Sequence, residues 1–245
     1  MRLTRCSIDL ALQPGQTVAL PEETANHLVR VMRLREGDGC VLFNGDGRDY
    51  PSTLVAVGKR EVQVRVDAAV SVGNESPLRI TLLQGVARGE KMDLILQKAT
   101  ELGVAAIVPV NAERTEVKLD AARASKRLAH WTSVVQSACG QSGRAVLPTV
   151  GAPEALAAAV ATLPPQTLRL TLDPQGTHRL SSLQQAPENG VVIAIGPEGG
   201  WSPRDRALLD SAGFQGLQLG PRILRTETAG LAAIAALQAR LGDLG

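Results

Sequence analysis

The sequence predicts an α/β protein in which a mostly parallel sheet follows a smaller, β-rich domain. From about residue 78 onward, short apolar runs alternate with helical patterns, which is typical of a parallel sheet. The part before residue 72 consists instead of strand patterns joined by glycine turns. A polar segment with Gly and Pro, residues 72–77, separates the two parts. We therefore expect one domain over residues 1–72 and a second over residues 73–245.

The first domain is predicted to be a small β-barrel or half-barrel. Alternating apolar patterns indicate strands at 40–44, 50–57 and 61–70, and Gly45-Asp46-Gly47 supplies a hairpin turn. One helix is expected from about residue 21 to residue 32.

The second domain is predicted to alternate strands with helices. The expected strands are 78–84, 106–110, 168–172 and 191–195, and the expected helices are 91–102, 125–138 and the alanine-rich stretch 151–165. The run 191–195 is continuous, apolar and β-branched, which indicates a strand buried on both faces.

Two glycine loops close to the C-terminus carry the strongest functional signal. The first follows residues 191–195, and its Gly196, Gly199 and Gly200 allow the backbone to turn sharply and approach a ligand. Ser202 then caps a helix that begins at Pro203 and ends near residue 213.

The second loop begins at Gly220 and leads into the last helix, which is expected to run to about residue 240 with Thr226 or Thr228 as its cap. Since ligands bind at the carboxyl ends of parallel strands, we expect both loops to form one composite pocket.

The loops match neither of the common nucleotide motifs. GxGxxG is absent, and so is the GxxxxGK[ST] pattern whose lysine cradles phosphates. Main-chain polar groups in an apolar collar suit a flat, neutral heterocycle such as adenine.

The composition of the chain limits the functions and locations that we expect for it. The formal net charge of +2 requires any basic surface to be local, and 2% aromatic residues argue against base stacking as the main mode of recognition. Cys6, Cys40 and Cys139 are far apart and outside any CxxC pattern, so we expect neither a metal site nor a disulfide framework. The sequence shows no signal peptide and no apolar run of membrane length, so we expect a cytoplasmic protein without a membrane partner.

The two loops, GPEGGWSPRD at 196–205 and LGPRILRTETA at 219–229, resemble the signature of the SPOUT-class RNA methyltransferases. More narrowly, they are similar to the RsmE family, which methylates N3 of a uridine in small-subunit ribosomal RNA. Residues 97–103 resemble the family's QKATELG, residues 113–115 its ERS element with Thr for Ser, and residues 141–144 its QSGR. The segment 27–33 matches the family's opening pattern more loosely. One departure is the lack of an acid near Cys139, which puts any role of that acid in doubt.

The resemblance implies a C-terminal SPOUT-type trefoil-knotted α/β domain and a PUA-like β-barrel before it. It also implies S-adenosylmethionine as the methyl donor, 16S rRNA of the small ribosomal subunit as the substrate, and a homodimer. A knot could not have been predicted from the residues, because chains almost never thread their own loops.

We assign candidate roles on this basis. The expected cofactor-binding residues are Leu172, Gly196, Glu198, Gly200, Leu219, Gly220, Ile223, Leu224, Thr228 and Ala229. Arg225 is the candidate that stabilises the uracil anion, and Glu198 is the candidate that accepts the N3 proton or hydrogen-bonds the uracil edge. Glu227 is a third candidate, or favours only the dipole of the last helix. The expected RNA-binding residues are Arg30, Arg33, Arg114 and Arg144; the first two, three residues apart, are expected to share a helix face.

Two alternatives stay open. Related SPOUT proteins methylate ribose 2′-hydroxyls or guanine, and a pocket of this kind does not exclude those reactions. The chain could also be a non-catalytic, RNA-binding ribosome assembly factor with a vestigial pocket, although Glu198 and Arg225 argue against this reading.

Overall fold

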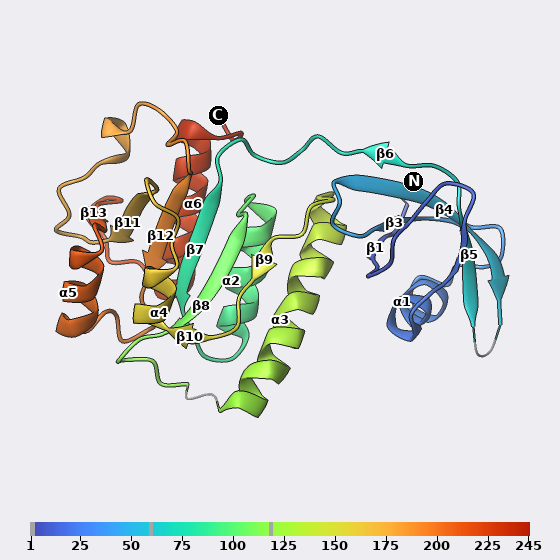
Figure 1. Cartoon of the computed structure of the whole chain (residues 1–245), viewed down its shortest axis with the longest axis horizontal. Coiled ribbons are helices and arrows are strands. Elements are labelled where there is room, and N and C mark those ends of the chain that lie inside the picture. Colours follow the sequence, from blue (N-terminus) through green and yellow to red (C-terminus); the bar gives the residue numbers. More distant parts are fainter. Residues whose placement is uncertain (1–2, 59–60, 118–119) are drawn as a thin grey trace. The chain divides into compact units, whose positions relative to one another are not determined.

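The structure, a computed structural model, describes residues 3–58, 61–117 and 120–245 (Figure 1). The chain forms two compact units. The N-terminal unit comprises Met1–Glu75 together with Gln136–Leu147, and the C-terminal unit comprises Ser76–Val135 and Pro148–Gly245. The long helix α3 (Ala121–Ser142) therefore contributes residues to both units. A division of the chain at one point near residue 72 would place the whole helix in the second domain.

The N-terminal unit is built on a mixed sheet in the order β1-β3-β4-β5-β2, with β6 paired to β4. The strands are β1 (Arg5–Ser7), β2 (Thr17–Ala19), β3 (Gly39–Phe43), β4 (Arg48–Val57), β5 (Val62–Val66) and β6 (Val70–Ser71). Strands β3, β4 and β5 pair antiparallel. Strands β4 and β5 alternate buried with more exposed residues, as the sequence pattern predicts, whereas β3 is buried from Cys40 to Phe43. Their buried side chains pack around Leu28, which is fully buried.

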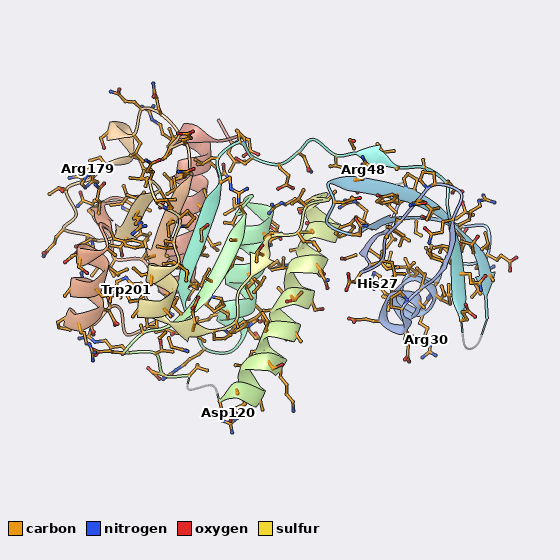
Figure 2. The ribbon with its side chains drawn as sticks, viewed as in Figure 1. His27, Arg30, Arg48, Asp120, Arg179 and Trp201 are labelled. Carbon is orange, nitrogen blue, oxygen red and sulfur yellow. The ribbon has the colours of Figure 1, made fainter. Side chains whose placement is uncertain are left out.

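The helix of this unit differs from the expected one. Instead of one helix over 21–32, a short α1 (Glu22–Asn26) continues into a wider π-helical turn, His27–Val31. Arg33 lies beyond it, with a left-handed φ of 60°. The expectation that Arg30 and Arg33 share one helix face is therefore wrong, because the helix ends between them. Both side chains are exposed, and Figure 2 shows Arg30 on this turn.

The C-terminal unit contains a sheet in which every pair of neighbouring strands is parallel, among the residues described. Its order is β10-β8-β7-β12-β11-β13, with β9 paired to β8. The strands are β7 (Ile80–Gly85), β8 (Ala106–Asn111), β9 (Thr149–Val150), β10 (Glu154–Ala155), β11 (Leu168–Leu172), β12 (Val191–Ile195) and β13 (Gln215–Leu217). The predicted mostly parallel α/β domain is confirmed.

Helices cover both faces of this sheet (Figure 1). They are α2 (Glu90–Glu101), α4 (Leu156–Ala161), α5 (Pro203–Ser211), α6 (Thr226–Leu241) and a short 3₁₀ turn, Leu180–Ser182. Leu83 on β7 packs with residues of α4 and α5, whereas its neighbour Leu82 faces Gly230 of α6. Successive strand residues point to opposite faces, so β7 and β12 are buried on both sides. For β12 this confirms what its continuous apolar sequence predicts.

The expected helix within 151–165 begins later than predicted. Residues Glu154–Ala155 first add the short edge strand β10 to β8, and only Leu156–Ala161 are helical. Among the residues that the structure describes, no helix combines the length and the apolar character needed to cross a bilayer.

Candidate active site

The two glycine loops form opposite walls of one cavity of about 500 Å³ in the C-terminal unit. The central prediction from the sequence, a composite pocket, is therefore confirmed. The lining residues come from the end of β11, from β12 and the loop after it, from the segment between β13 and α6, and from the first turns of α6. Lys91 of α2, Arg206 of α5 and Leu217 at the end of β13 complete the lining. They lie at the carboxyl ends of parallel strands, where side chains and main-chain groups are free to contact a ligand.

The first loop is shaped by glycine and by a helix cap. Gly200 has a left-handed φ of 66°, and a Cβ on Gly196 would press against the Gly200 backbone at 3.2 Å. Ser202 and Asp205 form a reciprocal capping box at the start of α5, with Pro203 in its first turn. The local prediction for this helix start is confirmed, and the cap fixes the point at which the loop ends.

A buried tryptophan at the end of the first loop connects this loop to the sheet. Trp201, labelled in Figure 2, lines the cavity and donates its indole N–H to the Thr171 hydroxyl at 3.1 Å. Thr171 in turn donates to the main-chain oxygen of Ala194 at 3.1 Å. These two hydrogen bonds join the first loop to β11 and β12, so the sheet fixes the position of Trp201 in the cavity wall.

The second loop turns at Gly220, where φ is 101°, and ends at Arg225, the N-cap residue of α6. No side chain caps this helix, so the expected capping by Thr226 or Thr228 is wrong. Thr226 is buried and donates its hydroxyl proton to the main-chain oxygen of Gly196 at 2.6 Å instead. The Gly196 carbonyl in the first loop therefore sets the conformation of the Thr226 side chain. The residues next to Thr226 in the sequence give no sign of this contact.

Most of the expected cofactor residues line the cavity. The members of this group are Leu172, Gly196, Glu198, Gly200, Leu219, Gly220, Ile223, Leu224 and Ala229. Thr228 does not line it: its side chain is exposed, and its N–H bonds to the main-chain oxygen of Arg225. The candidates Arg225, Glu198 and Glu227 also line the cavity. Sequence reasoning did not assign Lys91, Trp201 or Arg206 to it.

Lys91 sits between two carboxylates of the cavity wall. Its Nζ lies 3.5 Å from Oε1 of Glu198 and 3.8 Å from Oε2 of Glu227. Glu198 also accepts a hydrogen bond of 3.1 Å from the main-chain N–H of Arg88. Burial by itself would raise the pKa of Glu198, but this N–H and the charge of Lys91 outweigh burial, and the pKa is lowered from 4.5. Glu198 is therefore ionised at neutral pH.

The expected RNA-binding arginines fall into different environments. Arg114 is exposed and donates to the main-chain oxygen of Gly199 at 3.1 Å, so it lies against the first glycine loop. Arg144 is only 5% exposed and belongs to the N-terminal unit, where it pairs with Glu75. Arg144 lies in a loop, as the sequence predicts, but this ion pair holds its guanidinium inside the unit.

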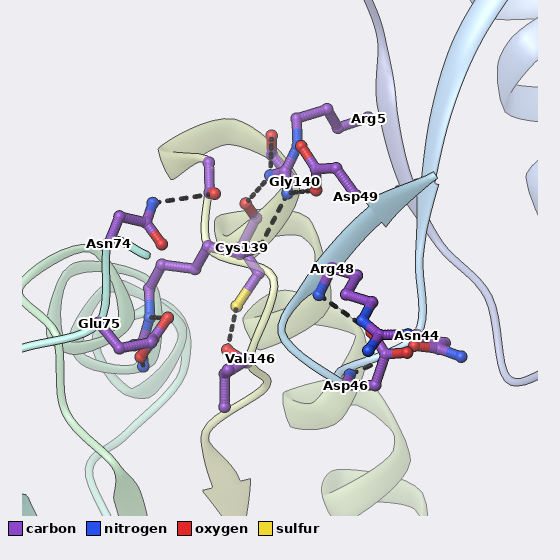
Figure 3. Close-up of polar contacts among 12 residues, drawn as sticks. Arg5, Asn44, Asp46, Arg48, Asp49, Asn74, Glu75, Cys139, Gly140 and Val146 are labelled. Carbon is purple, nitrogen blue, oxygen red and sulfur yellow. Dashed lines mark hydrogen bonds and ion pairs between the residues drawn. The ribbon is translucent and has the colours of Figure 1, made fainter. Parts of the chain in front are cut away.

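A second buried arginine holds the end of α3 in the N-terminal unit. Arg5 pairs with Asp49 and donates to the main-chain oxygens of Cys139 and Arg144 at 2.8 and 3.2 Å (Figure 3). The guanidinium adds a charged donor at the C-terminal end of α3, where the helix dipole favours a cation. Burial raises the pKa of the Cys139 thiol to about 11, so this thiol is neutral at physiological pH.

Two family models match the chain in the order of its domains. Residues 74–238 match the RNA methyltransferase domain, and residues 20–67 match the PUA domain of RNA methyltransferases. The parallel sheet, the composite cavity and this match define the class of the protein: it is an RNA methyltransferase.

Individual relatives narrow the class. The ribosomal RNA small subunit methyltransferase E of Buchnera aphidicola is 31% identical over 99% of this chain and 98% of its own. The solved structure of the Neisseria gonorrhoeae enzyme of the same name, bound to S-adenosyl methionine, is 40% identical with a TM-score of 0.94 over the whole of both chains. A Legionella pneumophila methyltransferase, solved with the cofactor SAM, is 38% identical with a TM-score of 0.95, again over the whole of both chains. The chain belongs to the ribosomal RNA small subunit methyltransferase E family.

Proposed function

We propose that this protein transfers the methyl group of S-adenosylmethionine to N3 of a uridine in 16S rRNA of the small ribosomal subunit. The observation that carries the proposal is the single cavity that both glycine loops enclose, with Glu198, Glu227 and Arg225 in its lining. The full-length match to relatives named ribosomal RNA small subunit methyltransferase E supports the choice of substrate.

The cavity residues fit the donor. A volume of about 500 Å³ lies within the range of sites that enclose a small organic ligand. Leu172, Leu219 and Ala229 offer apolar walls for an adenine ring, and a Cβ on Gly196 would crowd the neighbouring backbone. Three carboxylates in the lining, from Asp173, Glu198 and Glu227, suit the ribose hydroxyls and a cationic sulfonium.

The bound donor supplies an electrophilic methyl group, and the protein must supply alignment and an unprotonated N3. Positioning of two reactants is worth about 7–11 kcal/mol of the barrier. The exposed guanidinium of Arg225 stabilises negative charge on a uracil oxygen, because an opposite charge favours the ionised base. The ionised Glu198 accepts the N3 proton or hydrogen-bonds the uracil edge.

The exposed arginines Arg30, Arg33 and Arg114 serve in this proposal as phosphate contacts that set the register of the RNA. A uridine whose N3 is accessible must be unpaired or flipped out, so a single-stranded site within an assembled particle is the natural substrate. The protein acts in the cytoplasm, where such particles are made.

A homodimer belongs to the same proposal. Helix α6 is apolar around most of its circumference, and Leu231, Ala232, Ala235 and Ala236 stay half-exposed along one side. A two-fold axis would cover this stripe with its own copy. Light scattering of the purified protein should return twice the mass of one chain.

The test combines binding with product analysis. The purified chain should bind S-adenosylhomocysteine in calorimetry, and it should produce N3-methyluridine when small subunits lacking the modification are incubated with S-adenosylmethionine. Methylated ribose or methylguanine in the nucleoside digest would assign a different SPOUT reaction. Binding of RNA without any binding of S-adenosylhomocysteine would favour an assembly factor.

A further inference from the structure

A chain of buried hydrogen bonds lies behind the wall of the cavity. Nε2 of Gln84, at the end of β7, donates to the main-chain oxygen of Gly85 at 3.0 Å and to the hydroxyl of Thr226 at 3.1 Å. Thr226 donates to the main-chain oxygen of Gly196 at 2.6 Å. Gln84 is fully buried and Thr226 is 8% exposed, so the three bonds are shielded from water.

The direction of these bonds is fixed by their ends. A carbonyl oxygen only accepts, so the bond to Gly85 requires the NH₂ group of Gln84 on that side. The same NH₂ group then donates to Thr226, whose single hydroxyl proton is left for Gly196. Replacing the hydroxyl therefore leaves the Gly196 carbonyl without this donor, whereas replacing the amide removes the donor that orients the hydroxyl.

The chain of bonds joins the two glycine loops of the cavity to strand β7 behind them. Gly196 is in the first glycine loop, Thr226 ends the second, and both line the cavity. Gln84 belongs to the central strand on which both depend, and a Cβ on its neighbour Gly85 would overlap Pro197 of the first loop. The spacing of the two loops is thus set at one point, beside β7.

We propose that Gln84 and Thr226 are positioning residues for the methyl donor. Thr226, oriented by Gln84, fixes the Gly196 carbonyl and with it the distance between the two walls that enclose the adenosyl group. Neither side chain needs to contact the reacting atoms. The inference rests on the proposed function, because it assigns these residues to the binding of that donor.

The test compares two substitutions at Thr226 with one elsewhere. Thr226→Val keeps the shape of the side chain and removes the hydroxyl, whereas Thr226→Ser keeps the hydroxyl. Thr100→Val is the matched control, because Thr100 is also fully buried in the C-terminal unit and donates its hydroxyl to a main-chain oxygen, that of Leu96 at 2.8 Å, outside the cavity lining. The readouts are S-adenosylhomocysteine affinity by calorimetry, KM for the donor, kcat, and the thermal unfolding midpoint.

We expect Thr226→Val to weaken S-adenosylhomocysteine binding about tenfold, which corresponds to ~1.4 kcal/mol. The KM for the donor should rise by a similar factor and more than kcat falls. Thr226→Ser should recover most of the affinity. Thr100→Val should lower the unfolding midpoint and leave the affinity within about twofold.

Two results would overturn the inference, and they differ. If wild-type protein binds S-adenosylhomocysteine and Thr226→Val binds it equally well while unfolding at a lower temperature, the hydroxyl is only structural and the proposed function stands. If wild-type protein binds no S-adenosylhomocysteine, the proposed function fails and the inference fails with it.

Discussion

The main-chain N–H of Arg88 donates a hydrogen bond of 3.1 Å to Oε1 of Glu198. This bond joins the segment before α2 to the first glycine loop and directs the carboxylate toward the cavity that it lines. Together with the charge of Lys91, it more than offsets the effect of burial and lowers the pKa of Glu198.

The lowered pKa predicts a pH dependence of stability. A carboxyl whose pKa is lower in the folded state stabilises the fold above its ordinary value of 4.5, and this contribution disappears as the pH falls through the lowered value. The free energy of unfolding of wild-type protein should therefore decrease more between neutral pH and about pH 3 than that of Glu198→Gln. Urea denaturation of both proteins across this range measures the difference. Parallel pH profiles would contradict the prediction.

Removing the cation of Lys91 should impair methyl transfer. Lys91→Met leaves Glu198 and Glu227 without the charge between them, so the two carboxylates repel and the cavity wall shifts. We expect kcat/KM to fall about tenfold or more and Lys91→Arg to retain most of it. Lys98→Met is the matched control, because Lys98 pairs with Glu101 on the same helix and outside the cavity lining. An equal loss in both Met variants would point to helix stability instead.

Arg225 should act on the reaction more than on donor binding. Arg225→Ala removes the charge that we assign to the uracil anion, and we expect kcat to fall about 10²-fold or more with S-adenosylhomocysteine affinity within about threefold. Single-turnover methylation and calorimetry separate the two effects. Arg204→Ala, which removes an exposed arginine paired with Glu113, is the control and should change neither. A loss of affinity without a loss of kcat would reassign Arg225 to the donor.

Gly85 should not tolerate a methyl group. A Cβ at this position would overlap the nitrogen of Pro197, and backbone cannot move aside as a flexible side chain can. Gly85→Ala should displace the first glycine loop, weaken S-adenosylhomocysteine binding and destabilise the fold by about 1–3 kcal/mol. Gly151→Ala provides the comparison, since its Cβ would meet neighbours only at an ordinary 3.8 Å. Calorimetry and thermal unfolding of the two variants test the prediction, and similar behaviour of both would refute it.

The ion pair of Arg144 and Glu75 should stabilise the N-terminal unit. Glu75→Ala removes the carboxylate from a guanidinium that is 6% exposed, and we expect a loss of about 3–5 kcal/mol. Asp67→Ala, which breaks the exposed pair with Arg65, should cost less than ~1 kcal/mol. Denaturant unfolding followed by a probe in this unit compares the two. Equal costs would show that burial adds nothing to the first pair.

The sequence predicted the cavity because its main determinants are local. A continuous β-branched run specifies β12, and a Ser-Pro-x-Asp pattern specifies the start of α5. The glycines mark backbone that must turn sharply, as the positive φ values of Gly200 and Gly220 show. Two such loops near the C-terminus sufficed to place the site.

The features that the sequence did not predict depend on residues far apart in the chain. The residue type and position of Thr226 predict a helix cap, but its hydroxyl donates to the Gly196 carbonyl of the other loop instead. The sequence predicts Arg144 in a loop, but it gives no sign that the side chain is buried and pairs with Glu75, which is 69 residues earlier in the chain. Lys91 reaches the cavity only because α2 begins beside both loops. The π-helical turn at His27–Val31 has no recognised sequence signature, although its Leu28 is buried in the core of the N-terminal unit.

The pairing of β7 with β12 also limits when the protein can fold during synthesis. Ile80 pairs with Val191, and α6, which follows later in the chain, covers the same two strands. Contacts so distant in sequence form slowly, and the early strands stay without their central neighbour while translation continues. The nascent C-terminal unit must therefore wait, with an incomplete sheet, until β12 and α6 have left the ribosome.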